Sequence, residues 1–170
     1  MNNEPLEHDD AAFSSTGGKL QLVGAGSSQF GIFAEEISAI VSWREPTSLP
    51  HAPTSVLGVV SIQGRMLTVL DLATLPVHEA QLTSGGLSKT HEHIIALRGA
   101  EQLALAIETL GEVIQLKPGE AGAESLARQG NITTPVLATL QREGTEIKIL
   151  NLKGLFPTAI QGRQRRQRRF

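Results

Sequence analysis

The sequence predicts an all-β fold with short helices, organised as two small β-barrels packed side by side. Short apolar segments rich in β-branched residues recur along the chain, and turn-forming residues separate them, a pattern typical of barrels and sandwiches. One pair of these segments forms a clear hairpin over residues 56–75. The pattern of that hairpin returns about eighty residues later, which indicates that one supersecondary unit is used twice.

The central hairpin is predicted by two apolar runs on either side of Gln63 and Gly64. A two-residue turn with glycine suits this connection, because glycine takes positive φ angles without steric cost. The return strand ends on Asp71, a carboxylate inside an otherwise apolar run. If Asp71 is buried, it needs hydrogen-bond donors, and backbone N–H groups at the strand end are the simplest source.

The internal repeat is seen in two alignments that keep the same order in both halves of the chain. Residues 64–72 align with residues 144–152 at an offset of eighty, and residues 30–37 align with residues 103–110 at an offset of seventy-three. Polar residues match as well as apolar ones, since Asp71 falls on Asn151 and Glu35 falls on Glu108. Two blocks in register make chance the weaker explanation.

The first half divides into short extended segments with turns between them. We expect strands over 19–23 and 29–33 around a turn at 24–28, a helical turn over 34–40, and an extended segment over 41–43. Three prolines between residues 44 and 54 exclude a helix interior or a central strand there, so this stretch is a structured connection into the hairpin. Residues 76–89 have the composition of a loop.

The second half follows the same plan. We expect strands over 91–97 and 102–107, a short helix over 120–128, and a last hairpin formed by 132–140 and 145–152. The predicted organisation is a tail without fixed structure over 1–18, a folded domain over 19–157, and a basic tail without fixed structure over 158–170. Within the domain, the repeat predicts two related subdomains, approximately 19–83 and 89–157.

Composition narrows the class of protein. Of the 170 residues, 40% are apolar and 19% are charged, as in soluble globular proteins, and no cysteine is present for disulfides or thiol chemistry. No apolar run reaches the length of a membrane span and no signal peptide is visible, so we expect a cytoplasmic protein. Five arginines lie in the last eight residues, and without them the chain carries a net charge of −7, which argues against nucleic-acid binding by the folded domain.

No group of residues in the sequence has the types and spacing of a catalytic site or a cofactor site. His91 and His93 alternate, but no third ligand is tied to them by spacing, so we expect no metal site. Glu35, Glu36 and Glu108 stand at related positions of the two repeats, which favours a shared structural role over acid–base catalysis. Nucleotide-binding and hydrolase motifs are missing. The sequence therefore predicts a protein that is not an enzyme and needs no cofactor.

Four blocks of the chain together resemble the CheW-like domain family, the adaptors of bacterial chemosensory signalling. They are FGIFAEEISAI (30–40), LPHAP (49–53), GVVSIQGRMLTVLDL (58–72) and LAIETLGEV (105–113). The resemblance covers roughly residues 19–156, with the blocks in the family's order. It implies a fold of two five-stranded β-barrel-like subdomains around a shared hydrophobic core.

The resemblance also implies a function in recognition. Members of this family couple the helical hairpin tip of chemoreceptors to the regulatory domain of a CheA-type histidine kinase. The residues that fall on the family's receptor-facing positions are Gly58, Ser61, Gln63 and Ala104. Ile37 and Ala39 fall on the kinase-facing side.

Several residues depart from the family's pattern. Gln63 stands where the family usually has arginine, and it supplies neither the charge nor the planar fork of a guanidinium. Ala39 stands where a carboxylate is common, and Pro135 where glycine is common. These departures predict a divergent coupling adaptor of an accessory or surface-motility pathway. One alternative is a protein that binds the receptor but not the kinase, and another is a small β-barrel that binds nucleic acid through its basic tail.

Overall fold

The computed structural model describes residues 18–75, 90–99, 102–117, 120 and 135–155. Within these residues the chain forms ten strands, two short 3-10 helices and a turn of α-helix over residues 152–155. In order, the strands and 3-10 helices are β1 (Lys19–Ala25), β2 (Ser28–Phe33), η1 (Ala34–Glu36), β3 (Ile37–Ser42), β4 (Val56–Ile62), β5 (Arg65–Asp71), η2 (Leu72–Thr74), β6 (His93–Leu97), β7 (Leu103–Ile107), β8 (Thr109–Gln115), β9 (Val136–Arg142) and β10 (Thr145–Leu150). The predicted all-β class is confirmed.

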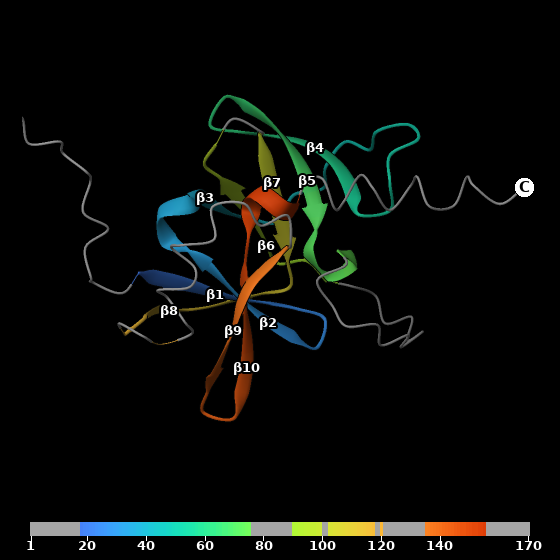
Figure 1. The fold of residues 1–170 in the computed structure, drawn as a ribbon. Coiled ribbons are helices and arrows are strands. Elements are labelled where there is room, and N and C mark those ends of the chain that lie inside the picture. Colours follow the sequence, from blue (N-terminus) through green and yellow to red (C-terminus); the bar gives the residue numbers. More distant parts are fainter. Residues whose placement is uncertain (1–17, 76–89, 100–101, 118–119, 121–134, 156–170) are drawn as a thin grey trace, which may run out of the picture.

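The strands form two five-stranded sheets, which lie in the upper and lower halves of the molecule in Figure 1. Sheet A has the strand order β8-β1-β2-β10-β9, and sheet B has the order β3-β6-β7-β5-β4. Neighbouring strands are antiparallel except at one place in each sheet, where β10 runs parallel to β2 and β5 runs parallel to β7. The prediction of two five-stranded units is confirmed.

The two sheets do not correspond to the predicted halves 19–83 and 89–157. Sheet A combines β1 and β2 from the first half with β8, β9 and β10 from the second, and sheet B combines β6 and β7 with β3, β4 and β5. Each half therefore gives its first two strands to one sheet and its last three to the other. The parallel contacts explain this exchange, because parallel neighbours cannot be joined by a tight turn and need a long connection.

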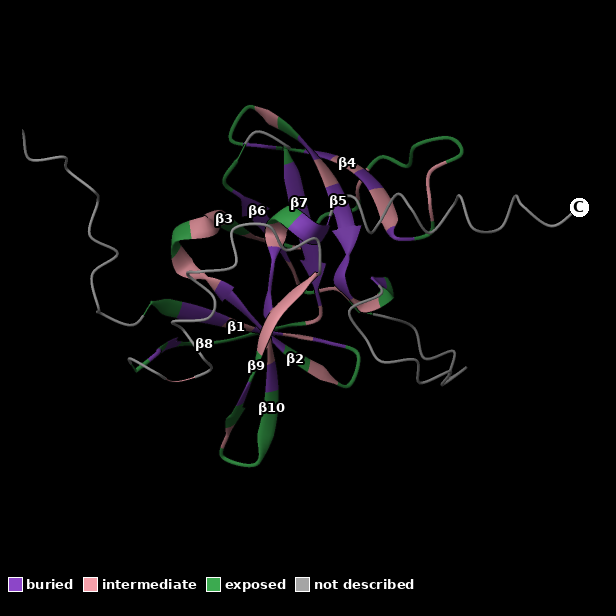
Figure 2. Cartoon of the chain, in the orientation of Figure 1, coloured by how far each residue is buried: buried purple, intermediate pink, exposed green. Residues whose placement is uncertain are grey.

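The apolar side chains gather in three clusters. The largest lies between the sheets and contains Phe30 and Ile32 from sheet A together with Leu70, Ile95 and Leu105 from sheet B. Each sheet also curls around a smaller cluster of its own. Figure 2 shows the result, with buried residues concentrated on β5, β6 and β7 and exposed residues at the tip of the β9–β10 hairpin. The predicted shared core is confirmed.

The two repeat-related hairpins have the same turn geometry. Gln63 and Gly64 have φ angles of 50° and 74°, and Glu143 and Gly144 have φ angles of 51° and 78°. Two consecutive positive φ values define the type I′ turn, whose twist matches that of the flanking strands. The sequence prediction of a tight turn at Gln63-Gly64 is therefore confirmed.

Some boundaries differ from the prediction. The helical turn expected over 34–40 is limited to the three residues of η1, because Ile37 already begins β3 and pairs with Leu97. The strand expected from His91 begins at His93. Most of the helix expected over 120–128 and both predicted tails lie outside the described residues.

The segment after β3 closes sheet B against its last strand. Thr47 and Val59 exchange two backbone hydrogen bonds of 2.8 and 2.9 Å, so the chain leaving β3 pairs with the free edge of β4. Gly58 makes this approach possible, because a Cβ atom at that position would lie 2.1 Å from the carbonyl oxygen of Thr47. Its φ angle of +146° is also one that residues with side chains rarely adopt.

We expect Gly58→Ala to destabilise the protein by about 2–3 kcal/mol, because the new methyl group collides with backbone and the φ angle is strained. Urea unfolding measures the change. Gly64→Ala is the matched control, since a Cβ there meets no atom within 4 Å and only the positive φ angle is penalised, at about 1 kcal/mol. Equal losses for the two variants would contradict closure at Thr47.

Candidate protein interaction sites

The predicted receptor-facing residues Ser61 and Gln63 are both exposed on the β4–β5 hairpin. Ser61 pairs directly with Met66 on β5, so the two side chains lie on the same face of the sheet. The Met66 side chain is 57% exposed, which is unusual for a residue of this type in a strand. An unbranched, polarisable side chain next to a serine and a glutamine forms a surface that can adapt to an apolar partner.

The other two predicted receptor-facing residues do not offer side chains to a partner. Ala104 is fully buried, and its methyl group packs in the cluster inside sheet B. Gly58 is buried under the backbone of Thr47. The register places Gly58 beside Val69, and Val69 beside Ala104, so both residues belong to the same row across the sheet. Their small size lets the sheet curl, which is a structural role.

The predicted kinase-facing residues Ile37 and Ala39 lie on β3, the opposite end of the strand order of sheet B from β4. Both are half-buried, because Ile37 packs against the shared core and Ala39 against the cluster inside sheet B. The pairing with β6 shifts between them, and the intervening Ser38 donates from its hydroxyl to the carbonyl of Ala96 at 3.1 Å. This bulge changes the direction of the strand beside the predicted surface.

The structure adds exposed apolar residues that sequence reasoning did not assign to a surface. Ile40 on β3 is 36% exposed, and Val113 on β8 is 53% exposed. Ile40 was placed in the predicted helical turn over 34–40, and no strand was predicted at Val113, because the apolar pattern does not reveal which segment will be last in a sheet. The available signal was the run of apolar residues at consecutive positions, as in Ile40-Val41, which cannot all face one core.

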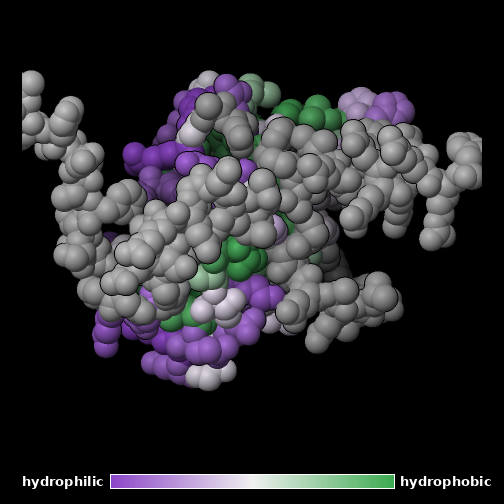
Figure 3. Space-filling model, in the orientation of Figure 1, coloured by the Kyte–Doolittle hydropathy of each residue, from purple (hydrophilic) through white to green (hydrophobic). Residues whose placement is uncertain are grey.

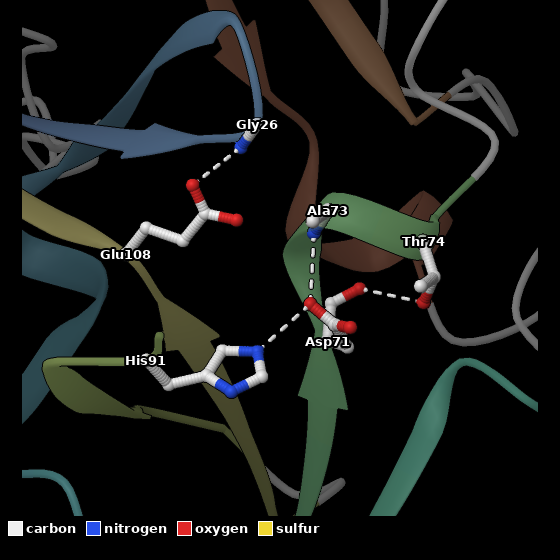
Figure 4. Close-up of polar contacts among 6 residues, drawn as sticks. All are labelled: Gly26, Asp71, Ala73, Thr74, His91 and Glu108. Atoms are coloured by element: carbon white, nitrogen blue, oxygen red, sulfur yellow. Dashed lines mark hydrogen bonds and ion pairs between the residues drawn. The ribbon is translucent and has the colours of Figure 1, made fainter. Parts of the chain in front are cut away.

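Asp71 is the buried carboxylate that the sequence predicted at the end of the hairpin (Figure 4). Its Oδ1 atom accepts a hydrogen bond from the N–H of Ala73 at 3.1 Å, and it lies 3.2 Å from Nε2 of His91. The backbone carbonyl of Asp71 accepts from the Thr74 hydroxyl at 3.0 Å. The prediction that backbone N–H groups satisfy this acid is confirmed.

His91 extends this contact to a third part of the chain. Its ring stacks on Trp43, with 4.6 Å between ring centroids and 26° between the planes. The backbone N–H of Trp43 also donates a hydrogen bond to the backbone carbonyl of Glu92 at 2.9 Å. Asp71, His91 and Trp43 therefore hold together the ends of β5 and β3 and the segment before β6. His91 has a structural role here, and no group of three or more candidate metal ligands occurs among the described residues.

The repeat-related glutamates have different surroundings. Glu108 accepts a hydrogen bond at Oε2 from the N–H of Gly26 at 3.0 Å and so stabilises the turn between β1 and β2 (Figure 4). Glu35 is exposed. In Glu36, burial and the neighbouring charge of Glu35 raise the pKa of the carboxyl from 4.5 to about 7, against a lowering effect of Lys153. One carboxyl oxygen of Glu36 is buried and finds no hydrogen-bond partner in the part of the chain that the structure describes.

We expect Asp71→Ala to lower the free energy of unfolding by about 2 kcal/mol, because the N–H of Ala73 and the ring of His91 lose their acceptor. Asp71→Asn keeps an acceptor oxygen, as Asn151 does at the related position, and should cost less than about 1 kcal/mol. Chemical denaturation compares the two variants. A similar loss in both would show that the charge of Asp71, and not its hydrogen-bonding oxygen, stabilises this corner.

The raised pKa of Glu36 predicts that the stability of the protein depends on pH. Its pKa is higher in the folded state, so the folded protein binds more protons between pH 4.5 and about 7, and the free energy of unfolding falls as the pH rises through this range. Glu36→Gln should remove this slope. Denaturant titrations at pH 4.5, 5.5 and 7 measure it, with the exposed Glu45→Gln as control. An unchanged slope in Glu36→Gln would contradict the assignment.

Comparisons with known proteins agree on one family. The sequence model of the CheW-like domain matches residues 19–159. The chain is similar to the chemotaxis protein CheW of Rhizobium meliloti (strain 1021), with 25% identity over 158 residues that cover 88% of this chain and 95% of the relative. It is also similar to a probable chemotaxis protein CheW of Rhizobium etli, with 24% identity over 91 residues, 52% of this chain and 55% of that protein.

A solved structure has the same fold. The crystal structure of the scaffolding protein TtCheW from Thermoanaerobacter tengcongensis superposes with a TM-score of 0.64 at 18% identity, over 91% of this chain and 94% of that chain. None of the described helices is long and apolar enough to cross a membrane. The family model spans most of the 170 residues and both sheets. The chain belongs to the CheW-like domain family.

Proposed function

We propose that this protein is a non-catalytic chemosensory adaptor that couples chemoreceptors to a CheA-type histidine kinase by protein–protein binding. The observation that carries the proposal is the match of the CheW-like domain over residues 19–159 on a fold of two five-stranded sheets. The relatives named above are chemotaxis proteins, and the structural relative is a scaffolding protein. Adaptors act by binding their partners and catalyse no reaction, which agrees with a sequence in which we find no catalytic motif.

The arrangement of sheet B supports binding of two partners at once. The proposed kinase surface lies on β3, around Ile37, Ala39 and the exposed Ile40, and the proposed receptor surface lies on the β4–β5 hairpin, around Ser61 and Gln63. These strands are the first and last in the order of the sheet, and the segment after β3 pairs with the edge of β4 at Thr47 and Val59. Because the surfaces use different strands, one partner need not displace the other.

The surfaces suit weak, repeated contacts. A helical receptor tip would lay an apolar stripe against exposed aliphatic and methionine side chains. Each contact would bury a small area, as in transient signalling interfaces, and an array of many copies would gain strength through multivalency. Proteins of this kind do not need a deep pocket.

We further propose that the protein is a divergent member that serves an accessory or surface-motility pathway. Gln63 at the receptor-facing turn and Ala39 on the kinase-facing strand are the departures that support this proposal. A neutral glutamine removes one cation from the receptor surface, and the half-buried Ala39 offers only a methyl group to the kinase. Retained receptor binding with weak or lost kinase binding is the alternative that these departures favour.

Nucleic-acid binding is the second class of function to test, because of the five arginines in the last eight residues. Base stacking needs exposed aromatic side chains. Among the described residues, Phe30 is fully buried, Phe33 is half-buried, and Trp43 is covered by His91. The described surface therefore offers no stacking platform, which favours the adaptor.

The first experiment is a calorimetric or NMR titration against a receptor hairpin-tip fragment and, separately, the regulatory domain of the cognate kinase. Binding to both supports an ordinary coupling adaptor. Binding to the receptor alone supports the divergent alternative. Binding to neither would overturn the proposed function.

Two matched variants separate the surfaces. We expect Gln63→Glu to weaken receptor binding about tenfold and to leave kinase binding unchanged, because it adds a charge at the exposed β4–β5 turn. Ile40→Glu should weaken kinase binding by a similar factor and leave receptor binding unchanged. Each variant is the control for the other in the same titrations. Loss of both activities in either variant would contradict two separate surfaces.

A further inference from the structure

A groove of about 360 Å³ lies at the end of sheet A where the β1–β2 and β9–β10 turns come together. All five strands of the sheet and the β9–β10 turn contribute to its walls. The lining residues are Leu22, Val23, Gly24, Gln29, Thr109, Gly111, Glu112, Arg142, Glu143, Thr145 and Ile147. In Figure 3, hydrophilic residues gather at this lower end of the molecule, where Figure 1 places the β9–β10 hairpin. The mouths of β-barrels are frequent positions for binding sites.

Arg142 gives the groove its chemical character. The Nη1 atom of its guanidinium is buried and has no hydrogen-bond partner among the described residues. Glu112 and Glu143 line the same groove, and neither accepts a hydrogen bond from this nitrogen. A buried guanidinium nitrogen without an acceptor is costly, and a carboxylate is the group that its planar fork matches best.

The internal repeat shows that this polar groove is particular to sheet A. At the offsets of the repeat, Arg142 corresponds to Ile62 and Glu112 corresponds to Ala39 in sheet B. Ile62 is 3% exposed and packs with Ala39 in the apolar cluster that fills the same end of sheet B. This end of sheet B is therefore filled by apolar side chains, whereas the related end of sheet A stays open and carries charged side chains.

We propose that the groove of sheet A binds the carboxylate of an acidic side chain presented by a protein partner. The carboxylate lies against Arg142, and the stem of the side chain lies on Leu22, Val23 and Ile147. Glu112 and Glu143 at the same groove select for a backbone N–H or a basic side chain next to the acid. This interaction is a further contact beyond the two surfaces of the adaptor function and does not depend on them.

The charges of the groove favour a single carboxylate over a phosphate group. The lining holds one arginine and two glutamates, so a doubly charged anion would meet stronger repulsion than a singly charged carboxylate. A carboxylate would supply an acceptor for Arg142, and the neighbouring donor of the ligand would pair with Glu112 or Glu143. The open edge of the groove also admits a side chain that remains attached to a larger chain.

The test uses the blocked peptide acetyl-Gly-Glu-Lys-Gly-amide and two-dimensional ¹⁵N NMR of the full chain. We expect saturable shifts at Thr109–Glu112 and Arg142–Thr145, including the side-chain N–H of Arg142. The same peptide with Gln in place of Glu should bind at least fivefold more weakly. Raising the salt concentration should weaken binding of the Glu peptide.

Variants of the protein complete the test. Arg142→Gln should abolish the shifts, whereas Arg44→Gln, which changes an arginine that contacts Ser61 on sheet B, should leave them unchanged. Glu143→Gln keeps Arg142 but removes a carboxylate that selects the neighbouring lysine, so it should weaken binding of the Glu-Lys peptide, and it decides the question if Arg142→Gln does not fold.

Four results would overturn the proposal. They are the absence of saturable shifts, equal binding of the Glu and Gln peptides, unchanged binding in Arg142→Gln, and unchanged or stronger binding in Glu143→Gln. Equal binding of free acetate and the peptide would overturn the assignment to a protein partner. None of these results affects the receptor and kinase titrations.

Discussion

The parallel pairings of β2 with β10 and of β5 with β7 are the constraint on which the rest of the structure depends. Each joins strands that are far apart in the sequence and come from different halves of the chain. Without these pairings, every sheet would separate into a hairpin and a group of strands with open edges, which are marginal structures in water. Neither half of the repeat can therefore complete a sheet alone, and both sheets form only when the whole chain folds.

This exchange also builds the core between the sheets. Because β2 and β7 are the third strands of their sheets, Phe30 and Ile32 on one and Leu105 and Ile107 on the other meet in the shared cluster. The sheets consequently hold a fixed relation, and surfaces on sheet B keep their position relative to sheet A. An adaptor that works by geometry needs this rigidity, since it contributes no chemistry of its own. The contact of Asp71, His91 and Trp43 serves the same end within sheet B.

Much of the fold could be predicted because the local patterns are strong. Alternating apolar residues, the Gln63-Gly64 turn and the buried Asp71 each depend on residues near in sequence, and all three were correct. The exchange of strands between halves could not be predicted, because the repeat reveals that two units are related and not which partners they choose. For the same reason the burial of Ala104 inside sheet B could not be predicted, although the family resemblance assigned this residue to the receptor-facing positions. Burial depends on pairing that is distant in sequence.

The comparison of the two repeats explains where specialisation is possible. At the end of sheet B, small and apolar residues such as Ala39 and Ile62 close the sheet on itself, and the side chains left outside are the exposed ones on β3 and the β4–β5 hairpin. At the related end of sheet A, Glu112 and Arg142 keep a polar groove open. A buried guanidinium nitrogen without an acceptor lowers stability, and cavities in a sheet interior do so as well. In sheet B the related position holds the buried Ile62. The arginine at position 142 therefore gains nothing in stability over an isoleucine. The proposed contact with an acidic partner gives the arginine a function at this end of the sheet, because a bound carboxylate would supply the acceptor that its buried nitrogen lacks among the described residues.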